Sequence, residues 1–270
     1  MRKPKAPEMP ARQAAARLME AHARRERFSP LPEGLAPKSV EEAYAIQDAF
    51  LALRSDKLGP IAGYKIALSS TEMQRFVGVN EPQAGAILRS QVRRSPARIR
   101  ASDYVNLIVE FEIAVEMGDD LPVADAPFTR ERVVQAVGAV MPAIEIADDR
   151  GADYSRLRHH PYELIADNGW NEGAALGEPV RDWRSIDLGK VLGAAAINGR
   201  KVGEGRGEAA MGHPLDAVAW IANDLASRGR ALLRGEFVIT GSLVTSKPVR
   251  AGDRVEFVAG GLGKVQLAVD

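Results

Sequence analysis

Two glutamates lie two residues apart in one apolar run, and a third lies alone in another. Glu110 and Glu112 belong to Val109-Glu-Phe-Glu-Ile-Ala-Val-Glu116, and Glu145 belongs to Met141-Pro-Ala-Ile-Glu-Ile-Ala. Side chains alternate between the faces of a strand, so Glu110 and Glu112 would share one face. Carboxylates at that spacing can hold a divalent cation, and oxygen ligands alone favour Mg²⁺ or Mn²⁺. The alternative is a solvated face of a sheet.

Two further observations favour a site over a solvated face. Glu145 is flanked by Ile144 and Ile146, and a carboxylate in such an apolar run is unfavourable unless it faces a ligand. Lys65 lies in the middle of another strand-like apolar run, residues 61–68. Lysine is disfavoured in such a run unless it lines a pocket or reaches a partner. The alternative for Lys65 is a packed stem whose ammonium group reaches water.

The elements that would position these residues alternate between helices and short strands. The patterns predict helices over residues 11–27, 39–53, 70–77, 129–140, 162–167 and 214–229. They predict strands over residues 61–68, 86–88, 97–99, 107–115, 141–147, 174–176, 191–197, 200–202, 237–241, 254–259 and 264–269. We therefore predict an α+β fold with two parts, a helical N-terminal segment at 1–60 and a strand-rich body at 61–270.

The composition narrows the classes of partner. The 270 residues are 46% hydrophobic and 27% charged, as in globular proteins, and the formal net charge is zero. We therefore expect no nucleic acid and no membrane as a partner. The absence of cysteine excludes disulfides, thiolate zinc sites and a cysteine nucleophile. No apolar run approaches the roughly 20 residues that cross a bilayer, and we expect a cytoplasmic protein.

Other motifs give weaker signals. The glycines of residues 203–207 lack the Lys-Ser/Thr ending of a phosphate loop, so a substrate loop or a packing contact is the better interpretation. His159 and His160 are adjacent, but nothing nearby completes a set of metal ligands. His213 precedes a proline at a helix start, where a capping role is the usual one. The sequence has no Gly-x-Ser-x-Gly elbow, so an esterase triad is unsupported.

Taken together and in order, several segments resemble the fumarylacetoacetate hydrolase superfamily. Within it they resemble the group of 2-keto-4-pentenoate hydratases, 2-oxo-hept-3-ene-dioate hydratases and 4-oxalocrotonate decarboxylases. The segments are Gly63-Tyr-Lys-Ile-Ala-Leu-Ser, Glu110-Phe-Glu-Ile-Ala, Asp120-Leu-Pro, Pro142-Ala-Ile-Glu-Ile-Ala-Asp-Asp-Arg150, Ala166-Asp-Asn168, Gly205-Arg-Gly, Gly212-His-Pro-Leu-Asp-Ala, Ile239-Thr-Gly-Ser, Ala251-Gly-Asp and Gly261-Leu-Gly. The resemblance runs from about residue 43 to residue 270 and is specific as a set.

The resemblance implies a fold and a chemistry. It implies the mixed β-roll of that superfamily behind a helical N-terminal part, and a homo-oligomer of at least two chains. It implies that Glu110, Glu112 and Glu145 hold Mg²⁺ or Mn²⁺ beneath a small 2-oxo acid, with Lys65 in proton transfer. Near a cation and in an apolar strand, the pKa of Lys65 would be lowered towards neutrality, which suits that role.

Substrate-binding residues are implied by the same resemblance. They are Gln83, Asp167, Asn168, Trp170 and Arg206. Two positions depart from the pattern of the group, since Gln83 stands where an aspartate is usual and Trp170 where a serine is usual. A neutral Gln83 takes no proton, and an indole fills space that a serine leaves to the substrate.

The sequence leaves three possible functions to compare. The leading prediction is a metal-dependent lyase that hydrates a small 2-hydroxy-dienoate in the breakdown of aromatic compounds. The alternatives are decarboxylation of a 2-oxo-3-enedioate, and a catalytically silent member that binds or assembles with a related enzyme. Hydrolysis of a carbon–carbon bond is less expected, because no glutamate forms an evident pair with His22 in the N-terminal helix.

Overall fold

The computed structural model describes residues 9–270, and within that range it contains six α-helices. They are α1 (Met9–Ala23), α2 (Val40–Leu58), α3 (Thr71–Val77), α4 (Arg130–Ala136), α5 (Glu163–Ala166) and α6 (Pro214–Ser227). Seven short 3₁₀ segments are Arg89–Gln91, Ala101–Asp103, Val123–Asp125, Tyr154–His159, Asn168–Trp170, Trp183–Ser185 and Gly207–Ala209. No helix among the described residues is long and apolar enough to cross a membrane.

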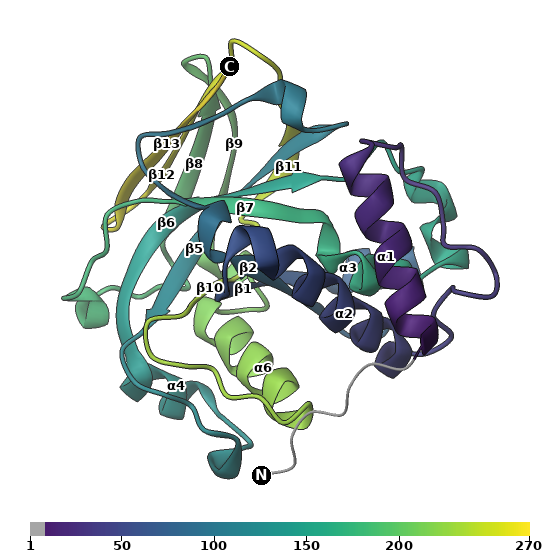
Figure 1. Ribbon diagram of the computed structural model, residues 1–270. Helices are drawn as coiled ribbons and strands as arrows, with labels where there is room; N and C mark the ends of the chain where they lie inside the picture. The colour runs from purple at the N-terminus through teal and green to yellow at the C-terminus, as the bar shows by residue number, and fades with distance from the viewer. Residues whose placement is uncertain (1–8) are drawn as a thin grey trace.

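Thirteen strands in the same range form two mixed sheets (Figure 1). The strands are β1 (Ile61–Ala67), β2 (Gln83–Leu88), β3 (Val92–Arg94), β4 (Ala97–Ile99), β5 (Leu107–Met117), β6 (Val137–Asp148), β7 (Asn171–Leu176), β8 (Leu192–Ile197), β9 (Arg200–Arg206), β10 (Phe237–Ile239), β11 (Val244–Pro248), β12 (Arg254–Ala259) and β13 (Gly263–Val269). The larger sheet has the order β2-β1-β10-β5-β6-β7-β3, with β11 also paired to β5. The smaller sheet has the order β4-β13-β12-β8-β9.

The long antiparallel pair β5 and β6 forms the centre of the larger sheet and curls across the molecule (Figure 1). The alternation predicted for β5 is present, because Val109, Phe111, Ile113 and Val115 join the main hydrophobic core. On that face the Phe111 ring lies 5.7 Å from the ring of Phe257 in β12, which joins the two sheets. The opposite face of β5 carries the glutamates.

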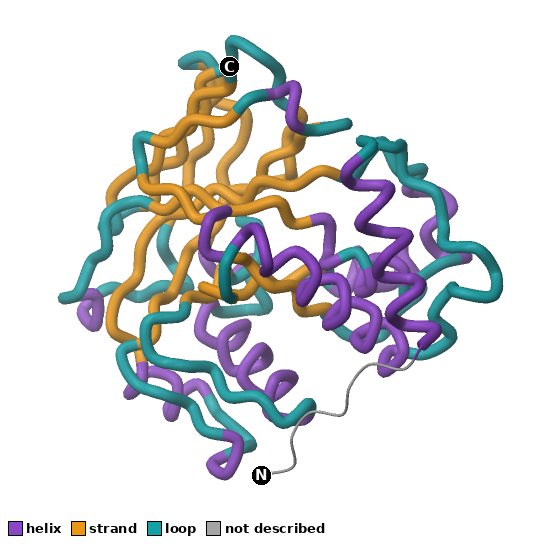
Figure 2. Tube along the Cα trace, in the orientation of Figure 1, coloured by secondary structure: helices purple, strands orange, loops and turns teal. Residues whose placement is uncertain are grey.

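The helix α2 packs beside β2 at one end of the larger sheet, and α1 packs on α2 (Figure 1 and Figure 2). Ser39 caps α2, as its sequence predicts, by accepting a hydrogen bond from the backbone N–H of Glu42 at 3.2 Å. Apolar side chains of both helices form one cluster that also includes Ala166 at the end of α5. The N-terminal helices are therefore packed on the segment that leads into β7.

The predicted fold class, α+β with curled mixed sheets behind N-terminal helices, is confirmed. The predicted boundary between 1–60 and 61–270 falls in the turn between α2 and β1, and residues 1–8 lie outside the described residues. The division into two domains stays a prediction.

The helix predicted over residues 129–140 is wrong at its C-terminal end. The helix α4 ends at Ala136, and β6 begins at Val137. Glycine and β-branched residues follow, which favour a strand over a helix. A Cβ at Gly138 would lie 3.0 Å from the Cα of Gly118, so the glycine is required for the close approach of the strands at this end of the β5–β6 pair.

Candidate active site

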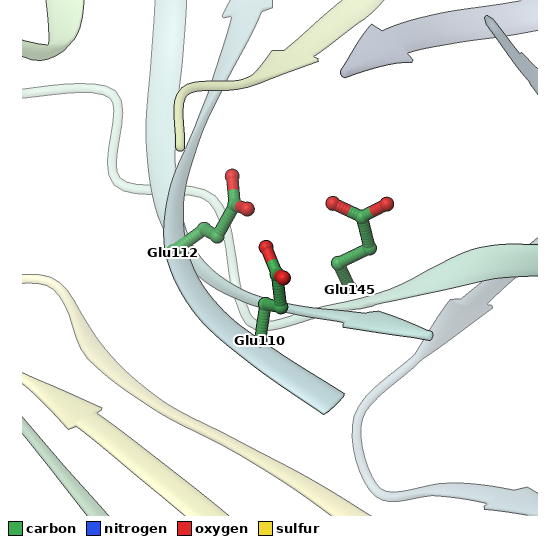
Figure 3. A group of neighbouring side chains, drawn as sticks. All are labelled: Glu110, Glu112 and Glu145. Atoms are coloured by element: carbon green, nitrogen blue, oxygen red, sulfur yellow. The ribbon is translucent and has the colours of Figure 1, made fainter. Parts of the chain in front are cut away.

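Strand register brings the three glutamates together. Glu110 in β5 lies directly opposite Glu145 in β6, and Glu112 follows two residues along β5 on the same face. Figure 3 shows the three carboxylates converging on one space from the two strands. One oxygen from each carboxylate lies within 4.8 Å of the others. The structure thus assembles the acidic cluster that the alternation predicts.

The hydrogen bonds of these carboxylates leave ligand atoms unused. The backbone N–H of Gly241 donates to Glu112 Oε2 at 2.7 Å, and Asn171 Nδ2 donates to Glu145 Oε1 at 2.9 Å. Glu112 Oε1 and Glu145 Oε2 are buried and find no hydrogen-bond donor among residues 9–270. Buried carboxylate oxygens without a partner are costly, and a hard cation satisfies them. The donor set therefore fits Mg²⁺ or Mn²⁺.

Lys65 completes the cluster from β1. Its ammonium Nζ lies 3.2 Å from Glu145 Oε1 and donates to the carbonyl oxygen of Gly169 at 3.3 Å. One ammonium group faces three carboxylates, so the cluster is short of positive charge. A divalent cation supplies that charge, which is a second reason why the site fits one.

Burial and neighbouring charges shift the pKa values of Glu110, Glu112 and Lys65. Burial raises the pKa of Glu110 to about 7, and repulsion by Glu145 adds to the effect. Burial and the same repulsion raise the pKa of Glu112 as well. Burial alone would lower the pKa of Lys65, but the carboxylates outweigh it and leave that pKa raised. The lowered pKa that the sequence suggests for Lys65 is therefore not found in this structure.

A cavity of about 540 Å³ opens beside the cluster, and Lys65 and Glu110 lie in its wall. Much of the rest is apolar and comes from distant parts of the chain: Leu68, Met73, Val77, Ile108, Ala147, Leu157, Leu164 and Trp170. Ser69, Ser70, Ser242, Thr245 and Ser246 supply hydroxyl groups on another part of the wall. Lys65 is the one cationic side chain among the described residues that line it.

Trp170 is the predicted substrate-binding residue that lines this cavity. Its indole is 5% exposed and meets Phe28 and Tyr154 edge-on, with ring centroids at 5.5 and 5.7 Å. The indole Nε1 is buried and has no hydrogen-bond acceptor in the described part of the chain. Trp170 is therefore held as a rigid wall rather than as a surface side chain.

The other four predicted substrate-binding residues lie outside the cavity wall. The side chain of Asn168 is engaged with the backbone of β2, donating to Ala86 O at 2.8 Å and accepting from Ala86 N at 2.7 Å. Gln83 is buried and donates to Pro161 O at 3.3 Å, and Asp167 is buried against two cations described below. Arg206 is exposed and donates to Lys190 O at 3.2 Å.

Two contributors to the site carry no signal in the local sequence. Gly241 and Asn171 bond the glutamates from positions 129 and 26 residues away in the chain. A Cβ at Gly241 would lie 2.7 Å from Ser69 Oγ, and its φ of 105° favours glycine. Gly241 is indicated by the sequence only through the family resemblance, to which the Ile239-Thr-Gly-Ser segment belongs.

His22 does meet a glutamate, but not as a base. Its Nδ1 lies 3.2 Å from Glu172 Oε1 and its Nε2 lies 2.7 Å from Asp167 Oδ1. Both ring nitrogens face carboxylates, so neither has a free lone pair with which to activate water. The pairing gives no support to hydrolysis of a carbon–carbon bond.

Comparison with known proteins identifies one matching family and several similar enzymes. The profile of the family described as fumarylacetoacetate (FAA) hydrolase C-terminal matches residues 66–270. A 2-hydroxyhexa-2,4-dienoate hydratase of Comamonas testosteroni is 32% identical over 253 residues, which cover 93% of this chain and 94% of the relative. A 2-keto-4-pentenoate hydratase of Paraburkholderia xenovorans is 32% identical over 254 residues, covering 94% and 93% of the two chains.

A solved structure is similar over nearly the whole chain. It is the 4-oxalocrotonate decarboxylase from Pseudomonas putida G7, complexed with magnesium and adipate. The TM-score is 0.87 at 26% sequence identity, and the match covers 96% of this chain and 97% of that one. The similarity thus extends through the N-terminal helices, beyond the part matched by the family profile.

Proposed function

The chain belongs to the fumarylacetoacetate hydrolase family, and we propose that it is a divalent-metal-dependent lyase that hydrates a small 2-hydroxy-dienoate. The observation that carries the proposal is the convergence of three carboxylates, two of them buried, with one buried ammonium group beside a cavity. The hydratases among the relatives, which match nearly end to end, support the reaction type.

In this proposal Glu110, Glu112 and Glu145 hold Mg²⁺ or Mn²⁺. The bound cation supplies Lewis-acid chemistry, polarising the oxygens of a 2-oxo acid and stabilising the negative charge that develops on them. Gly241 and Asn171 keep Glu112 and Glu145 in place through one hydrogen bond each. Such supporting bonds fix the orientation of ligand carboxylates.

Lys65 is the proposed proton carrier. Its Nζ lies in the cavity wall, where Glu145 and Gly169 fix its direction at 3.2 and 3.3 Å. An ammonium group held there can give a proton to a substrate carbon and take one back from the enol oxygen. Hydration needs this transfer together with the addition of water, whereas decarboxylation needs only the transfer.

The cavity favours a substrate with one carboxylate. Lys65 is the one cation among its described lining residues, and the proposed cation site accounts for the first carboxylate. A second carboxylate would find no second cation among the described lining residues, only Glu72, hydroxyl groups and apolar side chains, so its charge would be poorly compensated. We therefore propose a 2-hydroxy-dienoate with an uncharged tail.

Decarboxylation of a 2-oxo-3-enedioate is the second candidate, favoured by the structural similarity to a 4-oxalocrotonate decarboxylase. A silent member that assembles with a related enzyme is the third.

Exposed Leu192 and Val258, at 45% and 41%, lie on the adjacent strands β8 and β12 and support a homo-oligomer through that sheet. A cytoplasmic location remains part of the proposal, and so do Gln83, Asp167, Asn168 and Arg206, which lie outside the cavity wall and would affect substrate binding indirectly.

The test offers the Mg²⁺-loaded protein two substrates, 2-hydroxypenta-2,4-dienoate and a 2-oxo-3-enedioate. We expect the dienoate chromophore to disappear through addition of water, with no CO₂ released from either compound. Release of CO₂ from the enedioate would favour the second candidate. Bound Mg²⁺ without turnover of any oxo acid would favour the silent member.

Lys65→Met provides the control within the same experiment. Methionine retains the bulk of the lysine stem and removes the ammonium group. We expect the variant to bind Mg²⁺ and to lose hydration and the exchange of deuterium at C3 of a bound 2-oxo acid. Exchange at the wild-type rate would remove Lys65 from the mechanism.

A further inference from the structure

A partly buried network of charges lies behind the site, on the side of the N-terminal helices. His22 at the end of α1 touches Asp167 and Glu172. Each carboxylate also has its own arginine, since Arg150 pairs with Asp167 and Arg54 Nη1 donates to Glu172 at 2.9 Å. The proposed reaction uses none of these five groups directly.

The geometry determines the charge of His22. A neutral imidazole has one N–H and one acceptor nitrogen, and the acceptor would then face a carboxylate oxygen. With carboxylates at 2.7 Å from Nε2 and 3.2 Å from Nδ1, only the doubly protonated ring donates in both directions. His22 is therefore an imidazolium bridge between two points of the chain that lie five residues apart.

The segment between these two points has an unusual backbone. Asn168, Gly169 and Trp170 have φ values of 54°, 59° and 58°, three consecutive residues in the left-handed region. An L-residue is strained in that region, so a tryptophan adopts it only where the surroundings hold it. The bridge through His22 holds the chain at Asp167, directly before this turn, and at Glu172, two residues after it.

The same turn carries two groups that support the site. Gly169 presents its carbonyl oxygen to Lys65, and Asn171 donates to Glu145. A Cβ at Gly169 would lie 3.3 Å from Lys65 Nζ, so the turn and the ammonium group are in close contact. A shift of the turn would move the direction of Lys65 and the orientation of Glu145 together.

We propose that His22 is a positioning residue, an imidazolium that holds Asp167 and Glu172 and thereby fixes the left-handed turn behind Lys65 and Glu145. The proposal rests on the proposed function, because it assigns those two residues to the reaction. It also gives the N-terminal helix α1 a part in the active site.

The titration of His22 follows from its neighbours. The groups that face it or its partners from the packed elements are Asp167, Glu172, Arg54, Arg150 and Glu163, with the Phe50 ring at 5.1 Å. Burial lowers the pKa of His22, but Asp167 and Glu172 outweigh it and raise the pKa to about 9. A raised pKa stabilises the fold fully below the unfolded value of 6.5, and this stability is lost as the pH rises through about 9.

The first test is ¹⁵N NMR of the imidazoles in the wild-type protein, which has four histidines. We expect both ring nitrogens of His22 to be protonated at pH 7 and to titrate near 9. A neutral His22 at pH 7 would overturn the proposal. This measurement needs neither a variant nor activity, so it decides the charge of His22 even if the proposed reaction is wrong.

The second test is His22→Gln, which retains a donor but not the charge or the double bridge. Each carboxylate keeps its arginine, so we expect the variant to fold. We expect Mg²⁺ affinity to fall about 10-fold and kcat about 10–100-fold, with a smaller change in KM. We also expect faster amide hydrogen exchange at residues 168–171 and a loss of the stability difference between pH 6.5 and 9.

His213→Asn is the matched control, because it removes a histidine at the start of α6 and keeps a capping side chain. Unchanged Mg²⁺ affinity and amide exchange in His22→Gln would overturn the proposal. An inactive wild-type protein would instead count against the proposed function, and the Mg²⁺ and exchange measurements would still decide the role of His22.

Discussion

The carboxylates in and behind the site fall into two kinds that differ in their partners. Burial alone would raise the pKa of Glu172, but Arg54 and His22 outweigh it and lower the pKa to about 2. Burial raises the pKa of Glu112, which faces the like charge of Glu145 and receives one backbone N–H. The first kind is satisfied by the protein, whereas the second gains from a cation.

This difference predicts the behaviour of Glu112→Gln. The substitution removes a ligand and a buried like charge, so Mg²⁺ affinity should fall by about 10-fold or more. The metal-free variant should melt no lower than the metal-free wild type, because repulsion in the cluster is relieved. Titration calorimetry and thermal unfolding in chelator measure the two effects.

Glu116→Gln is the control for this prediction. Glu116 lies four residues further along β5, and its side chain is 24% exposed beside Arg181 at 4.0 Å. It should bind Mg²⁺ as the wild type does. Equal affinities for the wild type and Glu112→Gln would remove Glu112 from the metal site.

Trp170 lines the cavity and helps to determine its shape. Its ring forms a wall with Phe28 and Tyr154, and its backbone belongs to the left-handed turn. The prediction that it limits the substrate end of the site remains a prediction. The structure adds a reason why the indole is immobile, since both its backbone and its ring are held by neighbours.

Among the elements, strand β2 and the turn at residues 168–170 approach each other unusually closely. A Cβ at Gly85 would lie 2.8 Å from the carbonyl oxygen of Asn168 and 3.0 Å from Lys65 Cγ. Gly85 also pairs with Lys65 across β1 and β2. The glycine therefore sets the distance between the lysine strand and the turn.

Gly85→Ala should accordingly destabilise the fold by about 1–3 kcal/mol and reduce kcat, because the added methyl group displaces the turn or Lys65. Denaturant unfolding and steady-state kinetics measure these effects. Gly34→Ala is the control, since a Cβ there meets no atom within 4 Å. An unchanged kcat in Gly85→Ala would show that the spacing of β2 and the turn is not critical.

Elements were predictable from the sequence where the pattern is local. The alternation of β5 and the helix starts at residues 39 and 129 depend on a few neighbouring residues, and the structure contains all three, with Ser39 and Thr129 as caps. The strand β11 was not predicted, because Val244-Thr-Ser-Lys-Pro248 has no alternation and pairs with β5 through a register shift. The strand predicted over residues 86–88 begins earlier, at Gln83, because β1 provides a partner strand.

The same distinction applies to the site. The acidic cluster follows from the spacing in β5 and one further glutamate in an apolar run. The bridge from His22 to Asp167 spans 145 residues, and no local pattern connects them. Lys65 was singled out by its apolar surroundings, whereas Asn171 became visible only once β7 was placed beside β6.

At the scale of the whole molecule, the N-terminal helices are part of the site rather than a separate cover. Arg54 in α2 and His22 in α1 hold the segment at residues 167–172, which borders the cavity. The Gln47 side chain adds bonds of 2.9 and 2.8 Å to Ala84 O and Ile165 O. A boundary after residue 60 would therefore separate parts that act together, even if each is a unit of the sequence.

The central claim is that Glu110, Glu112 and Glu145 form one cation site at which a 2-oxo acid binds beside Lys65. A crystal structure with Mg²⁺ and oxalate tests it most directly, because oxalate presents the same pair of oxygens. We expect Mg²⁺ bonded to one oxygen of each glutamate and to two of oxalate, all at about 2.0–2.1 Å. Mg²⁺ bound elsewhere, or oxalate held away from the three carboxylates, would contradict the account.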